Sequence, residues 1–229
     1  MKKIMTVIML CLVGTAFAIA QGTEEEKPEL KGAVSEDIRA IQVAKSLADY
    51  GYATDSASAL IEAAEILAQV KVQSLGVEGV ASGEPAEPGK TPSTKGYTAE
   101  QLLADGKALA KNDKTLTKWA NEVQKSIKKG TRGAVGGAKY DTDFVYGNNG
   151  TISYSVPFYA GQLAEIAVYS LDGRDLDLYV YDEYDHLIEK DTSYNVGAYV
   201  NFVPRWTGKF TIVIKNTSRW DGCFELYTN

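Results

Sequence analysis

The chain has 229 residues, of which 45% are hydrophobic and 24% charged, and its formal net charge is −6. This length is enough for two modest domains, each with a hydrophobic core of its own. The net charge becomes −8 once the two lysines at the start leave with an export signal. A diffusely acidic protein of this kind is not expected to bind nucleic acid or an anionic membrane surface.

The first twenty residues have the pattern of an export signal. Two lysines precede an apolar run over residues 4–13, and small-x-small cleavage sites follow at Ala16-Phe17-Ala18 and Ala18-Ile19-Ala20. The apolar run is shorter than the ~20 residues that a membrane-spanning helix needs. We predict a signal peptide over residues 1–20, cleaved after Ala20 with Ala18 as the competing site. No transmembrane segment is expected in the mature chain, which should be secreted or periplasmic.

Cysteine usage fits export without disulfides. Cys11 lies inside the signal, and the preceding Ile8-Met9-Leu10 lacks the small residue expected beside a lipidated cysteine, so a lipoprotein is the weaker alternative. Cys223 then remains as the one thiol, which excludes an internal disulfide. A catalytic cysteine needs a nearby base, and His186, the one histidine, falls in an apparent turn. We therefore expect Cys223 to be a small strand residue.

Residues 21–34 are polar and charged, which predicts a disordered leader. Apolar residues at helical spacing follow. Ser35 is the expected cap of a first helix that reaches Gly51, and Thr54 or Asp55 is the expected cap of a second helix that ends at Leu75. The two helices should form an antiparallel hairpin joined at Gly51.

Glycine and proline interrupt the helical pattern over residues 76–96, which predicts a flexible loop without helix or strand. Thr98 is expected to begin a third helix, and Asn112 or Asp113 a fourth that ends near Gly130. Residues 35–130 contain 13 acidic and 12 basic side chains, a balance typical of a solvated helical surface. We predict an all-α domain of two packed helical hairpins. Two units of a helical solenoid are the less favoured alternative, because such arrays usually need more repeats.

Residues 131–139 are rich in glycine and predict a hinge. From Tyr140 the hydrophobic period changes from helical to alternating, and 11 of the 14 tyrosines lie in this last part. Seven short strands separated by turn residues indicate an antiparallel β-sandwich over residues 140–229. The predicted strands are 143–146, 151–157, 163–170, 176–182, 198–203, 209–216 and 223–227. The fold class is therefore α+β, with a helical domain followed by a sandwich.

The alternation also predicts which side chains are buried. Leu176, Leu178 and Val180 share one face of their strand, and Asp177, Tyr179 and Tyr181 share the other. The same pattern recurs later in the chain, so we expect the inner face of the sandwich to include Phe210, Ile212, Ile214, Val200, Phe202, Phe224 and Leu226.

Residues 140–229 resemble the bacterial pre-peptidase C-terminal domain. The order of several short motifs carries the resemblance: Ala160-Gly161-Gln162, Asp172-Gly173-Arg174, Asp175-Leu176-Asp177-Leu178-Tyr179-Val180-Tyr181-Asp182, Pro204-Arg205-Trp206-Thr207-Gly208-Lys209-Phe210 and Phe224-Glu225-Leu226-Tyr227. The resemblance implies a jelly-roll-like sandwich of a kind attached to secreted proteases and other exported proteins. It implies binding of fibrous protein or polysaccharide only loosely, because only some relatives bind them.

Two groups of residues are candidates for a binding site. Clustered carboxylates supply the oxygen ligands that calcium prefers. The sequence lacks the Asp-x-Asp-x-Asn-Gly loop of a calcium site, so we predict no metal site. The carboxylates are Asp172, Asp175, Asp177, Asp182, Glu183 and Asp185, with Asp141 and Asp143 at the domain entrance. The second candidate is a group of aromatic side chains, which offer rigid contact area for a sugar or a peptide. Tyrosine is also common on half-exposed strands without any ligand. The aromatic residues are Tyr179, Tyr181, Tyr184, Tyr194, Tyr199, Trp206 and Trp220.

The sequence predicts no enzyme activity, no catalytic residue and no cofactor. It contains neither a Gly-x-Ser-x-Gly elbow nor a His-Glu-x-x-His pair, and a glycosidase built on two carboxylates is the remaining catalytic alternative. The predicted function is an exported, non-catalytic binding module that contacts an extracellular polysaccharide or protein, through residues that the sequence does not identify. An accessory protein of a secreted hydrolase and a purely structural envelope protein are the alternatives.

Overall fold

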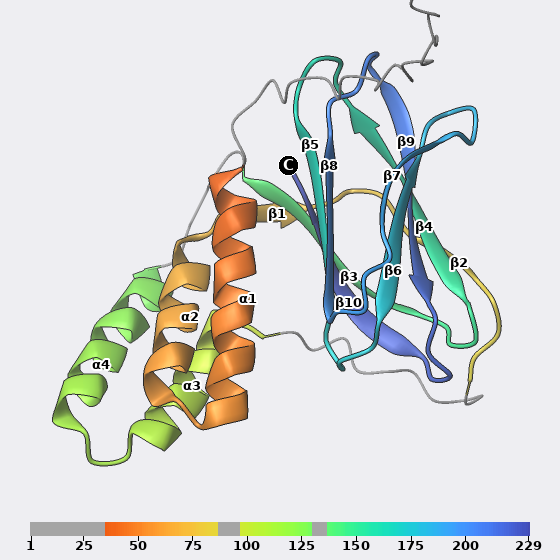
Figure 1. Cartoon of the computed structure of the whole chain (residues 1–229). Coiled ribbons are helices and arrows are strands. Elements are labelled where there is room, and N and C mark those ends of the chain that lie inside the picture. The colour runs from red at the N-terminus through yellow and green to blue at the C-terminus, as the bar shows by residue number, and fades with distance from the viewer. Residues whose placement is uncertain (1–34, 87–96, 130–136) are drawn as a thin grey trace, which may run out of the picture.

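The computed structural model describes residues 35–86, 97–129 and 137–229, and these form four helices beside a two-sheet sandwich (Figure 1). The predicted α+β class, with a helical part followed by an antiparallel sandwich, is confirmed. The expected signal peptide, residues 1–20, and the expected leader, residues 21–34, lie outside the described residues.

The helices are α1 (Glu36–Thr54), α2 (Ala57–Gln69), α3 (Ala99–Ala110) and α4 (Lys114–Lys129). The side-chain oxygens of Ser35 and Thr98 accept backbone N–H bonds at two helix starts, and this confirms both predicted caps. The cap of α2 is Ser56, so the expectation of Thr54 or Asp55 is wrong.

The predicted hairpin turn at Gly51 is also misplaced, because α1 continues through this residue to Thr54. A Cβ atom at Gly51 would collide with the Leu60 side chain, so glycine allows α1 and α2 to approach each other there. Asp55, with a φ of 50°, ends α1 in the left-handed conformation. The helical core next to this contact includes the fully buried Leu60, Ile61, Leu102 and Leu103. Burial of each stabilises the fold by about 1.5–3 kcal/mol.

The stretch of residues 72–82, between the two helical hairpins, belongs to the sandwich. It forms the short strands β1 (Val72–Ser74) and β2 (Val80–Ser82), and Leu75 and Val77 between them pack into the sandwich core. The expected continuation of α2 to Leu75 is therefore wrong, as is the expected absence of strands over residues 76–96. Valine at positions 70, 72 and 80 favours strand because its β-branched side chain suits a pleated surface. We call residues 70–82 the strap.

Eight further strands complete two five-stranded sheets. Sheet A has the order β1-β3-β10-β5-β8, and sheet B the order β2-β4-β9-β6-β7. The strap gives each sheet one edge strand, since β1 pairs with β3 and β2 with β4. The eight strands are β3 (Ala138–Val145), β4 (Thr151–Phe158), β5 (Ala164–Ser170), β6 (Leu176–Tyr181), β7 (Leu187–Asp191), β8 (Gly197–Phe202), β9 (Gly208–Asn216) and β10 (Gly222–Thr228).

All seven predicted strands are present, with bounds that differ by a few residues. Strand β3 begins at Ala138, inside the predicted hinge of residues 131–139, of which residues 131–136 lie outside the described part. Strand β7 was not predicted because its residues are mostly half-exposed and do not alternate. The predicted inner face is confirmed, and every residue expected there lies in the sandwich core.

A third cluster of apolar residues joins the helices to the sandwich. Ile38 and Ile41 of α1 are fully buried against the outer face of sheet A, where they meet Ala167 and Tyr227. Strand β10 is consequently buried along its whole length. In Figure 1 the helices stand on this side of the sandwich, and α1 lies nearest to it. The sequence did not indicate this interface.

Candidate binding face of the sandwich

The two sheets differ in what covers their outer faces. The helices cover sheet A, whereas none of the described helices lies over sheet B (Figure 1). Strand β6 lies inside sheet B, between β9 and β7, so both of its edges are hydrogen-bonded. Its outward side chains are therefore held on a rigid support, which a binding site needs.

Tyr179 and Tyr181 are the most prominent side chains on the outer face of β6. They are two residues apart and therefore point to the same side of the strand. Their rings stack with centroids 6.4 Å apart and planes inclined by 18°. Both side chains are half-buried, so part of each remains available to solvent.

The strand register identifies the neighbours of this pair. Tyr179 lies opposite Val213 of β9 and Lys190 of β7, and Tyr181 lies opposite Thr211. Residues directly opposite on neighbouring strands have Cβ atoms about 4.5–5.5 Å apart. We call this group, Tyr179, Tyr181, Lys190, Thr211 and Val213, the tyrosine face.

The Tyr179 hydroxyl donates a 3.0 Å hydrogen bond to the carboxylate of Asp177. Burial, this hydrogen bond and the negative charge of Asp177 raise the pKa of Tyr179. The phenol is therefore neutral at ordinary pH, and its oxygen is still able to accept a hydrogen bond from a ligand. The tyrosine face thus combines apolar ring area with hydroxyl groups and one ammonium group.

The other aromatic residues that the sequence suggested do not join this face. Tyr199 lies on sheet A, where its hydroxyl donates to the buried carboxylate of Glu165 at 2.7 Å. Trp206 packs on Phe210 of the sandwich core. Tyr184, Tyr194 and Trp220 are exposed, but they lie in three different connections between strands. The seven aromatic residues therefore form no single platform.

Three of the carboxylates that could serve as calcium ligands accept hydrogen bonds from neighbouring groups of the protein. Asp172 accepts a hydrogen bond from Ser170, and Asp175 accepts one from the backbone of Asn195. Asp182 accepts two backbone N–H bonds and contacts the His186 ring. Desolvation raises the pKa of Asp182, but these contacts outweigh it and leave the pKa below its ordinary value.

Asp141 and Asp143 lie apart from these loops, in a hollow beside the strap. Burial raises the pKa of Asp141, although hydrogen bonds from the Thr142 backbone and the Tyr154 side chain oppose this effect. Within residues 35–86, 97–129 and 137–229, no three side chains of the metal-binding types are grouped to hold an ion.

Cys223 and His186 lie in different surroundings, the thiol in a buried strand and the imidazole in an exposed turn. Cys223 is buried, and burial together with Asp172, Asp143 and Asp221 raises the pKa of its thiol to about 11. His186 lies in the predicted turn between β6 and β7, where its ring nitrogen is 3.1 Å from Asp182.

The outward neighbours on β9 were not identified from the sequence, although a signal was present. Phe210, Ile212 and Ile214 were predicted to point inward, so the residues between them must point outward. What the sequence did not provide is the register, which places Val213 directly beside Tyr179.

One of the comparisons with known proteins gives a match. No protein-family model and no curated protein matches the sequence. Among the described residues, no helix is long and apolar enough to cross a membrane. A solved structure, the pre-peptidase C-terminal domain of a collagenase from Bacillus anthracis, is similar over 40% of this chain and 88% of that domain, with 17% sequence identity and a TM-score of 0.35. A similarity at this level assigns neither a family nor a function.

Proposed function

We propose that the protein is an exported, non-catalytic binding module that contacts an extracellular polysaccharide or protein through the tyrosine face. The observation that carries the proposal is the stacked pair of Tyr179 and Tyr181 on the sheet face that the helices leave uncovered. Aromatic side chains give a large contact area and lose little conformational entropy on binding.

The surroundings of the pair support a polymer as the ligand. Tyrosine rings stack on the apolar faces of sugar rings or on side chains of an extended peptide, and neighbouring hydroxyl groups bond to the polar edges of either. Thr211 and the tyrosine hydroxyls supply such groups, and Lys190 adds a positive charge. The face lies along strands rather than in a deep cleft, which suits a ligand that extends beyond the contact.

The export part of the proposal has its support in the sequence. Residues 1–20 have the charged start, apolar run and small-residue cleavage sites of a signal peptide. The ordered motifs shared with pre-peptidase C-terminal domains support an accessory role beside secreted enzymes. The non-catalytic part rests on Cys223, whose thiol is buried and kept protonated by its raised pKa, so it is unsuited to act as a nucleophile.

The proposal is tested with a Tyr179→Ala/Tyr181→Ala variant on arrays of glycans and extracellular matrix proteins. A Tyr159→Ala/Tyr194→Ala variant is the matched control, because these two tyrosines are exposed in loops away from the face. Circular dichroism first verifies that both variants are folded. We expect the face variant to lose at least tenfold in affinity for any ligand of the wild type, and the control to keep it.

Three results would contradict the proposal. If the folded face variant retains all the interactions of the wild type, the tyrosine face is not the binding surface. If the wild type binds nothing on the arrays and captures no partner from the cell envelope, a purely structural role becomes the better interpretation. Turnover of a peptide or polysaccharide that a single Asp or Glu substitution abolishes would refute the non-catalytic assignment.

A further inference from the structure

Helix α4 concentrates positive charge in an otherwise acidic protein. Its sixteen residues contain five lysines and a single acidic residue, Glu122, a net charge of +4. The whole chain carries −6, so the remaining residues together carry −10. Positive and negative charges nearly balance over residues 35–130, but they are separated in space, because most acidic side chains lie outside α4.

Packing fixes the direction of these lysines. Ala120 and Val123 of α4 are buried in the helical core, and Leu116, Trp119 and Ile127 pack partly against it. The indole N–H of Trp119 donates a 2.6 Å hydrogen bond to Glu65 of α2, which holds the rotation of α4 about its axis. The opposite side of the helix consequently faces solvent.

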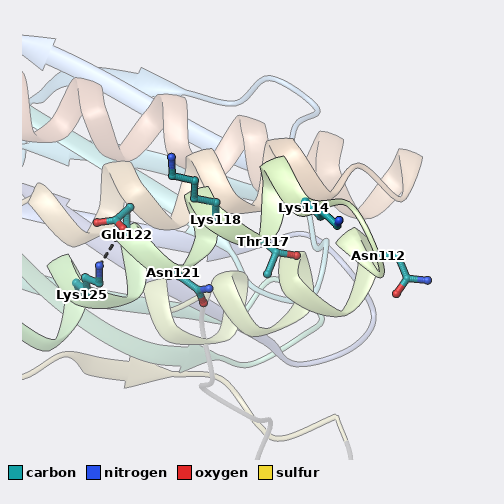
Figure 2. Close-up of a pocket in the computed structure, with 7 residues that line it drawn as sticks. All are labelled: Asn112, Lys114, Thr117, Lys118, Asn121, Glu122 and Lys125. Carbon is teal, nitrogen blue, oxygen red and sulfur yellow. Dashed lines mark hydrogen bonds and ion pairs between the residues drawn. The ribbon is translucent and has the colours of Figure 1, made fainter.

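The solvent side of α4 bears four lysines whose side chains are all exposed: Lys114, Lys118, Lys125 and Lys128. Figure 2 shows the first three, with Thr117 and Asn121 between them, along a shallow hollow of about 630 Å³. At 1.5 Å per residue, their Cα atoms extend over about 20 Å of the helix. We call these four residues the lysine stripe.

Most of this charge has no counterion among the residues that the structure describes. Lys125 pairs with Glu122 at 2.9 Å. Across the described parts of the chain, Lys114, Lys118 and Lys128 form no ion pair. Three unpaired ammonium groups on one helix face attract an anion more strongly than paired ones would, because no local carboxylate offsets their field.

We propose that the lysine stripe is a docking surface for the chain of an acidic polysaccharide. Repeated carboxylates on such a chain complement ammonium groups spaced along one line. Thr117, Asn121 and Ser126 lie on the exposed part of α4 and offer hydroxyl and amide groups to the sugar hydroxyls. This surface is separate from the tyrosine face and does not depend on the function proposed for it.

The composition of the stripe disfavours two other anionic partners. A membrane-surface helix inserts large apolar residues between its lysines, whereas the exposed residues of α4 are polar. Nucleic-acid surfaces usually combine arginine with exposed aromatic rings, and the solvent side of α4 has neither.

The test measures binding of the full chain to polygalacturonate at low salt, with neutral dextran as the uncharged reference. The test variant is Lys114→Gln/Lys118→Gln/Lys128→Gln, which removes the three unpaired charges without loss of helix propensity. The matched control is Arg39→Gln/Lys71→Gln/Arg205→Gln, which removes three exposed positive charges away from α4. A Lys→Arg triple variant at the stripe preserves the charge.

We expect the Gln variant of the stripe to bind polygalacturonate about tenfold more weakly, and binding of the wild type to weaken as salt is added. The control and the Lys→Arg variant should bind like the wild type. Three results would overturn the proposal: no binding of the wild type at low salt, an equal loss in the control, or tighter binding to anionic vesicles or single-stranded DNA than to polygalacturonate.

Discussion

Lys45 of α1 and Glu225 of β10 form an ion pair at the interface between the helices and sheet A, with side chains only 5% and 4% exposed. The Lys45 ammonium also lies 5.4 Å from the ring centre of Tyr97, and Tyr227 donates a hydrogen bond to Glu225. A second buried carboxylate, Glu165, accepts the backbone N–H of Ser35 at 2.6 Å. Polar contacts thus supplement the apolar interface that fixes α1 on the sandwich.

Removal of one partner of the Lys45–Glu225 pair should destabilise the protein strongly. A Glu225→Leu variant leaves the Lys45 ammonium buried without its counterion, and we expect a loss of about 3–5 kcal/mol in the free energy of unfolding. The Lys45→Met/Glu225→Leu double variant should recover most of this loss, because no charge remains buried. Urea denaturation measures both.

The exposed pair of Lys125 and Glu122 is the matched control for this experiment. Glu122→Leu should change the free energy of unfolding by less than about 1 kcal/mol. If the double variant is as unstable as Glu225→Leu alone, the cost comes from packing or from Tyr227 rather than from the unpaired charge.

The thiol of Cys223 should be unreactive in the folded protein. With a pKa of about 11, raised by burial and nearby carboxylates, less than about 1% of it is thiolate at pH 8. In a Cys11→Ser background, iodoacetamide should modify Cys223 slowly under native conditions and rapidly in guanidinium chloride, as followed by mass spectrometry. Equal rates in the two conditions would mean that the thiol is accessible and not held protonated by the fold.

The strap should contribute to the stability of the sandwich. Leu75 is 8% exposed and lies in the sandwich core, whereas Val72 on the same strap is 50% exposed. We expect Leu75→Ala to cost about 2–3 kcal/mol in the free energy of unfolding, and Val72→Ala less than about 1 kcal/mol. Equal effects of the two substitutions would contradict the position of Leu75 in the core.

The sequence predicted the strands of the sandwich better than the strap, because alternation is a local pattern whereas the strap depends on tertiary pairing. Alternation along β6 and β9 identified the inner residues, since a period of two assigns alternate side chains to opposite faces of the sheet. The strap was missed because Val70 and Leu75 also fit the period of α2, and only pairing with β3 and β4 selects the strand conformation.

The candidate site was only partly visible from the sequence for a similar reason. Tyr179, Tyr181 and Tyr199 all alternate with buried residues, so the pattern predicts an outward position for each. Which sheet face is covered depends on where α1 packs, and this is a tertiary contact without a local signal. Tyr199 consequently lies on the sheet that bears the helices, and the other two tyrosines lie on the sheet over which none of the described helices packs.

Asp191 connects the edges of the two sheets on the side opposite the strap, and its contribution should depend on pH. Its carboxylate accepts hydrogen bonds from the Ser193 hydroxyl at 2.6 Å and from the Tyr199 backbone N–H at 3.0 Å. Partial burial raises the pKa of Asp191, but these hydrogen bonds outweigh it and leave the pKa below its ordinary value. The stabilisation is therefore fully present above the unfolded-state pKa of about 4 and is lost as the pH falls through the lower, folded-state value.

An Asp191→Ala variant tests this dependence. Its urea midpoint should lie below that of the wild type at pH 6, and the difference should shrink as the pH falls below about 4, because protonation then removes the same interaction from the wild type. An Asp185→Asn variant, which neutralises an exposed carboxylate and suits the positive φ of that residue, is the reference for the general effect of charge. A difference between wild type and Asp191→Ala that stays constant from pH 6 to pH 2 would show that the side chain acts through packing and not through its charged hydrogen bonds.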